Sequence, residues 1–228
     1  MKKIRVLLVG AKGRMGTTLV DLVKEDPNIE IVGQCDLGDA IAPAIQNSDV
    51  TIDFSHAEAV EEICRVALQH GQPLVIGTTG HSPAQRELIR KTAQSVPVVF
   101  ASNFSIGVNA LFALTRRAGE ILRDFDISIV ETHHKTKKDA PSGTAKTLAQ
   151  IAKSTRKIDK EIPIESIREG EVVGEHTVIF STTSERLELT HRAASREIFA
   201  RGALRAAAWV IGKPARLYSM QDVLGLGL

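Results

Sequence analysis

Ile4-Arg5-Val6-Leu7-Leu8-Val9-Gly10-Ala11-Lys12-Gly13-Arg14-Met15-Gly16, residues 4–16, is the stretch that decides the fold of the N-terminal half. Its first six residues form a short apolar run, which is typical of a parallel strand buried on both faces. Three glycines at a spacing of three interrupt the run, and apolar residues then recur with helical spacing from Leu19 to Val23. The stretch therefore predicts a strand, a tight turn and a helix in direct succession.

The same alternation continues as far as residue 104. Strand-like runs are expected at 29–35, 50–54, 73–76 and 96–100, and helical stretches at 57–70 and 82–95. Strands that alternate with helices at short intervals favour a doubly wound parallel sheet. We therefore predict an α/β, Rossmann-like domain with a parallel sheet.

The pattern changes after residue 104. A long helix is expected at about 106–122, then a strand at 125–130 and a helix from Ser142; three strand-like runs follow at 164–168, 175–182 and 185–191, and a helix at 195–210. Strands without intervening helices indicate a second domain of α+β type with an open mixed or antiparallel sheet. The predicted domains are 1–104 with the C-terminal tail 214–228, and 105–213. Within the tail, Ser219 and Asp222 form a helix-capping pattern.

Composition and charge exclude several classes of protein. The chain of 228 residues is 43% hydrophobic and 25% charged, with a formal charge of +2, so no basic field favours nucleic acid as a partner. No apolar run approaches the roughly 20 residues that span a bilayer. Cys35 and Cys64 lie in apolar surroundings without ligand-like spacing, which indicates buried, reduced thiols. The expected location is the cytoplasm, away from membranes.

The glycine-rich turn predicts a dinucleotide site formed by Gly10, Ala11, Lys12, Gly13, Arg14, Met15 and Gly16. The pattern allows a tight turn, close approach of the backbone to a pyrophosphate, and a helix N-terminus aimed at it. Asp36 stands twenty residues after Gly16, where an acid binds the ribose. Its carboxylate would repel a 2′-phosphate, whereas Lys12 and Arg14 could reach one. The prediction is NADH as the preferred cofactor, with NADPH tolerated.

Two further loops follow predicted strands of the same sheet, Gly77-Thr78-Thr79-Gly80 and Ala101-Ser102-Asn103-Phe104. Ligands bind outside the carboxyl ends of parallel strands, so both loops are placed to line the nicotinamide side of the site. Ordinary turn chemistry is the alternative for either loop alone. Asp53 and Ser55 are weaker candidates at the end of the third strand.

A histidine- and lysine-rich loop connects the strand at 125–130 to the helix after it. It reads Glu131-Thr132-His133-His134-Lys135-Thr136-Lys137-Lys138-Asp139-Ala140-Pro141-Ser142-Gly143-Thr144. A metal site is disfavoured, because neighbouring histidines of an extended strand point to opposite sides; a solvated basic loop is a second interpretation. The third is an anion-binding catalytic site, in which a histidine transfers a proton, Lys137 supplies charge or a proton, and Ser142, Gly143 and Thr144 bind a carboxylate.

The loop resembles the signature E-x-H-H-x-x-K-x-D-x-P-S-G-T of the 4-hydroxy-tetrahydrodipicolinate reductase family. The glycine loop and the segments 52–55, 77–80, 101–105, 167–170 and 174–176 come in the order seen in that family, as does the run from His191 to Trp209. The resemblance covers nearly the whole chain. It implies reduction of a cyclic dicarboxylate by NAD(P)H at C4 with loss of water, in the diaminopimelate route to lysine.

The resemblance also implies roles for individual residues. His133 would donate or accept a proton and Lys137 would donate one, while His134 would contact the substrate and Gly143 and Thr144 would bind its carboxylate. The nucleotide would contact the glycine loop, Asp36, Gly77–Thr79 and Ala101–Phe104. The family is similar in its two-domain architecture and implies a homotetramer built through the sheet of the second domain. One departure is the short segment of thirteen residues between Asp36 and Val50.

Other residues and functions fit the sequence less well. His176 and His191 lie in strand-like segments and are expected to be structural, and Arg168 and Arg196 are expected to form ion pairs. The alternative enzyme is another two-domain NAD(P)-dependent oxidoreductase of a small carboxylate. A non-catalytic module that senses the state of the cofactor is the alternative from another class, although it has no need of the residues at 133–144.

Overall fold

The computed structural model describes residues 3–226, which form two compact units. The first unit comprises the chain up to Ser105 and again from Glu197 onward, and the second comprises Ile106–Arg196. The prediction that residues 197–213 belong to the second domain is therefore wrong. The helix in that segment buries its alanine-rich face in the core of the first unit. Helical periodicity shows that a helix has a buried face but does not show which sheet covers it.

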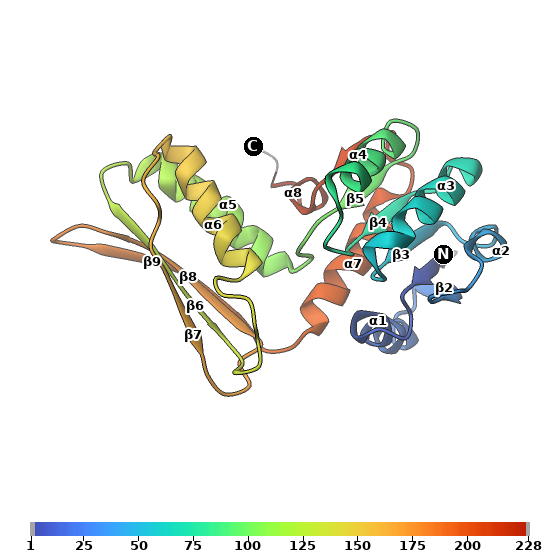
Figure 1. Cartoon of the computed structure of the whole chain (residues 1–228), viewed down its shortest axis with the longest axis horizontal. Helices are drawn as coiled ribbons and strands as arrows, with labels where there is room; N and C mark the ends of the chain where they lie inside the picture. Colours follow the sequence, from blue (N-terminus) through green and yellow to red (C-terminus); the bar gives the residue numbers. More distant parts are fainter. Residues whose placement is uncertain (1–2, 227–228) are drawn as a thin grey trace. The chain divides into compact units, whose positions relative to one another are not determined.

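The first unit alternates strands and helices as predicted (Figure 1). Its elements are β1 (Ile4–Val9), α1 (Arg14–Lys24), β2 (Ile29–Cys35), α2 (Ile41–Ile45), β3 (Val50–Asp53), η1 (Ala57–Ala59), α3 (Val60–His70), β4 (Leu74–Ile76), α4 (Pro83–Thr92), β5 (Val98–Phe100), α7 (Glu197–Val210), β10 (Leu217–Tyr218) and α8 (Met220–Val223).

Six strands make a parallel sheet in the order β10-β5-β4-β3-β1-β2. Strand β1 is buried on both faces, as its apolar run predicts. Val6 and Leu8 join the cluster formed with α1 and α7, whereas Leu7 and Val9 join the cluster formed with α2, α3 and α4. Helices therefore cover both faces of the sheet, and the prediction of a doubly wound domain is confirmed.

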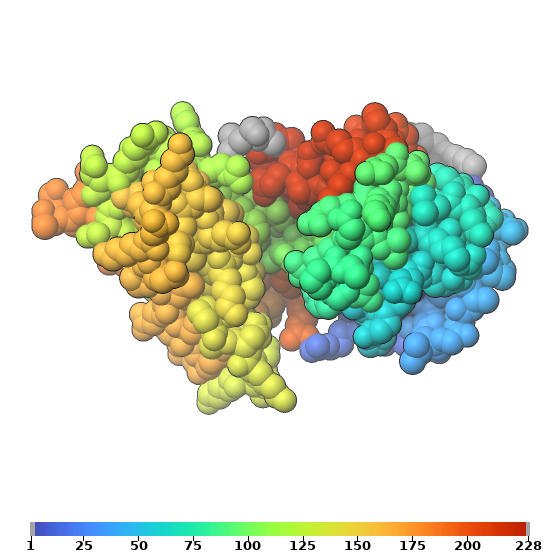
Figure 2. All heavy atoms as spheres, turned by 45° about the horizontal axis from the view of Figure 1, so that its top comes forward, coloured from blue at the N-terminus to red at the C-terminus, as the bar shows by residue number. Residues whose placement is uncertain are grey.

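Two elements of the first unit are absent from the prediction. The short crossover after Asp36 contains α2, whose Ile41 and Ile45 are buried against the sheet. Strand β10 pairs in parallel with β5 and extends the sheet by one strand. Figure 2 shows this C-terminal segment, in red, beside the green segment that contains β5. The predicted cap is confirmed, because Ser219 and Asp222 form a capping box at the start of α8.

The second unit is a four-stranded mixed sheet covered by two helices. Its elements are α5 (Ile106–Ile121), β6 (Asp126–His133), α6 (Gly143–Arg156), β7 (Ile164–Arg168), β8 (Gly174–Ser181) and β9 (Arg186–Ala193). The strand order is β7-β6-β8-β9, with β6 and β7 parallel and the other pairs antiparallel. Helices α5 and α6 lie side by side and bury a core on one face of the sheet (Figure 1). The predicted α+β unit is confirmed.

Burial of the two cysteines agrees with the sequence prediction. Cys35 and Cys64 are 3% and 0% exposed, and both are free thiols in the same apolar cluster. Within residues 3–226, every helix is too short or too polar to cross a lipid bilayer.

Candidate active site

The glycine loop joins β1 to α1 at the carboxyl edge of the parallel sheet. Gly10 has φ +86°, and a Cβ there would lie 2.5 Å from the carbonyl oxygen of Phe54. A Cβ on Gly16 would overlap the backbone oxygens of Gly10 and Ala11. Gly13 precedes α1 without a side-chain cap, and no acidic residue lies in the first turn. The loop thus requires glycine at these positions and presents an uncapped helix N-terminus, which is suited to a phosphate.

Asp36 lies beside the glycine loop, as predicted for a ribose-binding acid. Its Oδ1 accepts a hydrogen bond of 3.0 Å from the backbone N–H of Lys12, and its Oδ2 lies 4.0 Å from the Lys12 ammonium. The next residue, Leu37, is 94% exposed. The strand register therefore brings Asp36 and the glycine loop to one edge, where the carboxylate borders the predicted cofactor site.

The two threonine- and asparagine-containing loops after β4 and β5 reach the same edge of the sheet. Thr79 is exposed, whereas Thr78 is buried at 6% exposure. Ala101 and Asn103 are half-buried and Ser102 is exposed. Phe104 is 2% exposed and packs edge-on against Phe54 with ring centroids 5.7 Å apart, so its side chain belongs to the core.

A buried acid and histidine also lie at this edge. Asp53 is 0% exposed; its Oδ1 accepts hydrogen bonds from the N–H and hydroxyl of Ser55, whereas Oδ2 has no hydrogen-bond partner among the described residues. Burial raises the pKa of Asp53, although hydrogen bonds from Ser55 oppose this shift. His81 is 4% exposed, and neither of its ring nitrogens has a hydrogen-bond partner in the same described range. Burial lowers the pKa of His81.

The second unit holds the loop that sequence analysis singled out. Strand β6 ends at His133, and alternation along the strand places Glu131 and His133 on its buried side. Glu131 is 0% exposed and His133 is 7% exposed. Ser142 caps α6, accepting a hydrogen bond of 3.2 Å from the N–H of Ala145. The predicted helix start is thus confirmed, and the predicted strand is confirmed but runs three residues further than expected, through His133.

Glu131 is the centre of a polar cluster. Its Oε1 accepts hydrogen bonds from Arg168 Nη2 at 2.9 Å and from the backbone N–H of Ser142 at 3.1 Å. Its Oε2 lies 2.9 Å from Nδ1 of His133. Burial alone would raise the pKa of Glu131, but the hydrogen bonds from Ser142 and Arg168 lower it to about 2. The carboxylate is therefore ionised at neutral pH.

His176 belongs to this cluster, although sequence analysis assigned it a structural role. The antiparallel register of β6 and β8 sets it directly opposite Glu131. Its Nε2 lies 3.1 Å from the hydroxyl of Ser142, and its ring packs edge-on against His133 with centroids 5.0 Å apart. Burial, with the nearby charge of His133, lowers the pKa of His176 to about 4. The ring is neutral at pH 7, so its Nε2 can accept a hydrogen bond from the Ser142 hydroxyl.

His133 itself is surrounded by charges of both signs. Burial lowers its pKa, and the cations Lys137 and Arg168 lower it further, whereas Glu131 raises it. His133 therefore favours the neutral form near pH 7, while the adjacent Glu131 carboxylate favours its protonation. This balance suits a group that exchanges a proton during a reaction.

The remaining residues of the loop are more exposed. His134 Nδ1 lies 2.7 Å from the hydroxyl of Thr136, and the Lys137 ammonium bonds both oxygens of Asp139 at 2.7 and 2.9 Å. The Lys137 side chain is 22% exposed, whereas Lys138 lies in solvent. Lys137 is therefore the more constrained lysine.

The start of α6 offers an open surface at Gly143. Apart from its chain neighbours and the backbone of its own helix, no described atom lies within 4 Å of the position that a Cβ of Gly143 would occupy, and the first turn contains no acidic residue. The helix dipole and the backbone N–H groups of a first turn favour an anion. Ser142 is 3% exposed and faces the Glu131 cluster, which leaves Gly143 and Thr144 nearer to any ligand.

One set of possible metal ligands is present among residues 3–226. Ligand atoms of Glu131, His133 and His176 lie within 4.8 Å of one another. In this set of possible ligands, the histidine beside His133 is His176 on β8 and not His134, its neighbour in sequence. Arg168 occupies the other oxygen of the same carboxylate, and Lys137 adds a second positive charge. Those cations disfavour a divalent ion, so the cluster is better suited to proton transfer.

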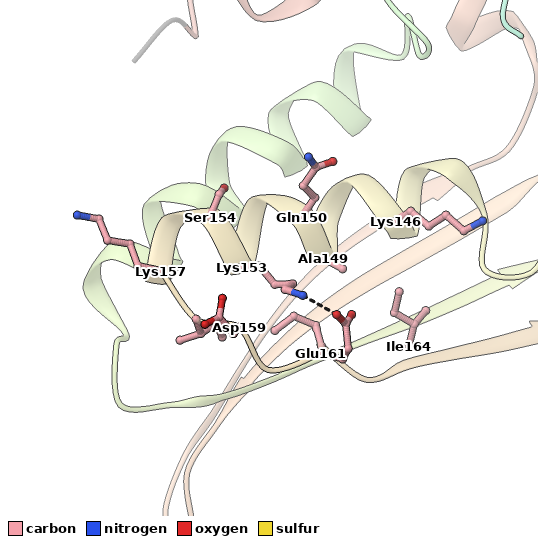
Figure 3. A pocket seen from close by; sticks show the side chains of 11 residues that line it. Lys146, Ala149, Gln150, Lys153, Ser154, Lys157, Asp159, Glu161 and Ile164 are labelled. Atoms are coloured by element: carbon pink, nitrogen blue, oxygen red, sulfur yellow. Dashed lines mark hydrogen bonds and ion pairs between the residues drawn. The ribbon is translucent and has the colours of Figure 1, made fainter. Parts of the chain in front are cut away.

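An open groove on the far side of α6 contains none of the predicted site residues (Figure 3). It runs between α6 and the segment that leads into β7, and Lys153 bonds Glu161 across it at 2.6 Å. Apolar side chains such as Ala149 and Ile164 form part of its lining. The groove is distinct from the cluster around Glu131.

Comparisons with known proteins cover both units. Residues 4–104 match the family model described as dihydrodipicolinate reductase, N-terminus, and residues 107–224 match the one described as its C-terminus. The 4-hydroxy-tetrahydrodipicolinate reductase of Akkermansia muciniphila is 46% identical, with 98% of each chain covered. The enzyme of the same name from Methanoregula boonei is 44% identical, covering 97% of this chain and 98% of the relative.

A solved structure has a similar fold. The dipicolinate-bound dihydrodipicolinate reductase from Paenisporosarcina sp. TG-14 superposes with a TM-score of 0.84 at 24% identity, covering 96% of this chain and 98% of that chain. The DAP dehydrogenase of C. glutamicum in complex with DAP superposes with a TM-score of 0.63 at 12% identity, covering 97% of this chain and 94% of that one. These two likenesses concern the fold.

Proposed function

This chain belongs to the dihydrodipicolinate reductase family, and from that premise we propose how its residues carry out the reaction. The enzyme is an NAD(P)H-dependent oxidoreductase of lysine and diaminopimelate biosynthesis. It reduces 4-hydroxy-tetrahydrodipicolinate to tetrahydrodipicolinate. One hydride and one proton enter the substrate and one water leaves, so the protein must supply an acid beside a bound dicarboxylate.

His133 and Lys137 are the proposed proton-transfer residues. The observation that supports this most strongly is the buried contact between His133 and the ionised Glu131, with Lys137 close enough to affect the pKa of His133. Addition of hydride to the conjugated ring system places negative charge on the ring, which a nearby acid neutralises. His133 is the primary donor in its imidazolium form and regains its proton from solvent, and the ammonium of Lys137 stabilises the developing charge and is the second acid of the site.

We propose that the two carboxylates of the substrate bind at different parts of the loop. Gly143 and Thr144 at the start of α6 receive one carboxylate, with Ser142 fixing the helix end, because the space beside Gly143 is open and the helix dipole favours an anion. His134 and Lys137 contact the other. Lys137 is held by Asp139 until the substrate arrives.

The first unit fits a dinucleotide cofactor. The uncapped N-terminus of α1 and the crowded backbone at Gly10 and Gly16 match a loop that receives a pyrophosphate. When bound, NAD(P)H supplies the hydride. The proposed contacts are residues Gly10–Gly16, Asp36, Gly77, Thr78, Thr79, Ala101, Ser102, Asn103 and Phe104, the last through its backbone.

NADH is the proposed preferred cofactor. The Asp36 carboxylate is held at the edge of the loop by Lys12 and would repel a 2′-phosphate. We expect kcat/KM to be higher with NADH than with NADPH, and Asp36→Ala to shift the ratio of the two at least tenfold toward NADPH. Equal efficiencies in the wild type would contradict the preference.

We also propose a cytoplasmic homotetramer assembled through the second unit. The sheet face opposite α5 and α6 carries Val130, Thr177 and Ile179 from its two central strands. Sedimentation velocity measures the mass of the assembly directly. A monomer at micromolar concentration would contradict the tetramer.

One assay tests the reaction and its residues together. Oxidation of NADH is followed with 4-hydroxy-tetrahydrodipicolinate made in situ by the preceding synthase. Wild type should turn over, and His133→Ala and Lys137→Ala should each lower kcat at least 100-fold. Lys138→Ala, a change in the solvated part of the same loop, should stay within twofold. Normal rates in both His133→Ala and Lys137→Ala would refute the proposed mechanism.

A further inference from the structure

We infer that Glu131 is a positioning residue, which sets the tautomer and orientation of the His133 ring and ties that ring to the start of α6. This inference rests on the proposed role of His133 in proton transfer. Glu131 is 0% exposed, so its carboxylate acts through its neighbours rather than on a ligand.

The contact with His133 carries the first step. Oε2 of Glu131 lies 2.9 Å from Nδ1 of His133, and neither atom has a hydrogen-bond partner among residues 3–226. The contact has ion-pair distance without the alignment of a hydrogen bond. A carboxylate at this place favours the proton on Nδ1. Nε2 is then the nitrogen that exchanges a proton with the substrate.

The surroundings of Nε2 agree with that assignment. Nε2 lies beside Gly174, the first residue of β8, where an added Cβ would be only 3.1 Å away. A glycine at this position spares the nitrogen a contact with a Cβ from β8. The ring is therefore held by a carboxylate on one nitrogen and left uncrowded at the other.

The second carboxylate oxygen carries the next step. Oε1 accepts hydrogen bonds from Arg168 and from the backbone N–H of Ser142. Arg168 also donates to the carbonyl oxygen of Asp139 at 2.6 Å. One carboxylate thus connects the His133 ring, Arg168 at the end of β7 and the start of α6. Loss of its charge changes the ring and the helix start together.

Charged and titratable groups face His133 from every element around it. They are Glu131 on β6, Lys137 and Asp139 in the loop, Arg168 on β7 and His176 on β8. Glu131 is the carboxylate closest to the ring. Removing its charge while Lys137 and Arg168 remain makes the imidazolium less favourable. The His133 titration should consequently move to lower pH.

The wild-type protein provides a test that needs no variant at Glu131. Nitrogen-15 NMR of protein labelled in its histidine rings distinguishes the two neutral tautomers, and the His133 signals are assigned by their loss in His133→Asn. We expect the neutral ring to carry its proton on Nδ1. A neutral ring protonated on Nε2 would overturn the inference.

Glu131→Gln tests the effect on the reaction. The amide keeps the size of the side chain and can still accept from Arg168, but it can offer an N–H to Nδ1 and so favour the wrong tautomer. We expect kcat to fall about 10²- to 10⁴-fold, as in other carboxylate–histidine pairs, with KM for NADH within twofold. The limb of the pH profile that reports His133 should move to lower pH. An unchanged pH profile would overturn the inference.

A double-mutant cycle separates positioning from a general structural effect. In the His133→Ala background, Glu131→Gln should lower kcat by less than threefold, because its effect passes through the missing ring. Full additivity of the two losses would overturn the inference. Glu120→Gln, which alters an exposed carboxylate of α5 paired with Arg117 at 2.9 Å, is the matched control and should leave kcat unchanged.

The inference and the proposed function fail in different ways. If His133→Ala retains full activity, the proton-transfer role of His133 is refuted. The tautomer measured by NMR still decides whether Glu131 sets the state of the ring, since that readout is independent of turnover. The same measurement decides the matter if Glu131→Gln does not fold.

Discussion

Each unit of the molecule buries a carboxylate near a histidine at the end of a β-strand, and the two pairs differ in what else surrounds the acid. The Glu131 carboxylate accepts hydrogen bonds from Arg168 and from the N–H of Ser142, which stabilise its charge and lower its pKa to about 2. Asp53 accepts hydrogen bonds from the N–H and hydroxyl of Ser55 at one oxygen, and burial raises its pKa.

The comparison shows that the partners of a buried acid, more than its burial, determine its state. Both carboxylates are 0% exposed, yet the shifts have opposite signs. A guanidinium and a helix-capping N–H turn Glu131 into a permanent anion that can orient His133. Asp53 lacks a cation, because burial lowers the pKa of its neighbour His81. Three substitutions test this difference, in order of expected effect.

Removal of the cation beside Glu131 should have the largest effect on stability. Arg168→Met leaves the carboxylate buried without its guanidinium, and breaking a buried ion pair from one side costs roughly 3–5 kcal/mol. We expect the free energy of unfolding at pH 7, measured by urea denaturation, to fall by about this amount.

Arg117→Met is the matched control for Arg168→Met. It removes an arginine that is 67% exposed from its pair with Glu120 and should cost less than about 1 kcal/mol. In addition, Glu131→Gln should recover part of the loss in the Arg168→Met background, because it removes the unpaired charge. Equal losses in Arg168→Met and Arg117→Met would show that the guanidinium does not stabilise Glu131.

The sequence was sufficient to predict the elements that depend on local pattern. The run Ile4–Val9, the glycine turn and the cap at Ser142 are each decided by residues a few positions apart. Their strands and helices were therefore predicted nearly to the residue. Strand β10 is only two residues long, and its place beside β5 depends on the rest of the sheet.

The missed features depend on contacts between distant segments. Gly202 in α7 packs against the backbone of Phe104 so closely that a Cβ would overlap its oxygen. That contact assigns α7 to the first unit, and no local pattern contains it. His176 joins the site because the register of β8 sets it opposite Glu131. One signal in the sequence did point to such contacts. Glu131 falls on the buried side of its strand, and a buried carboxylate requires hydrogen-bond or charged partners nearby.

The second prediction concerns the neutral histidine beside Glu131. The folded pKa of His176 is about 4, below the value of 6.5 for an unperturbed histidine, so below pH 6.5 the unfolded chain binds a proton that the folded chain does not. Stability due to His176 is thus present above pH 6.5 and is lost as the pH falls toward 4. The loss should amount to roughly 3 kcal/mol.

His176→Gln removes this dependence while retaining an acceptor for the Ser142 hydroxyl. Urea midpoints of the variant should therefore fall less steeply than those of the wild type between pH 6.5 and 4.5. His70→Gln, at an exposed position of α3, supplies the baseline. Parallel pH profiles for wild type and His176→Gln would mean that the buried ring does not resist protonation.

The smallest effect is expected at Asp53, where the acid lacks a cation. The folded pKa of Asp53 is raised, so its contribution to stability is present below the unfolded value near 3.8 and is lost as the pH rises through the folded pKa. Asp53→Asn cannot ionise and can still accept from the N–H of Ser55. Its stability relative to the wild type should therefore increase as the pH rises to 8, as measured by urea denaturation without cofactor. A loss of 2 kcal/mol or more at pH 8 would show instead that the Asp53 anion has a cationic partner, with His81 as the first candidate, and would make the two acid–histidine pairs alike.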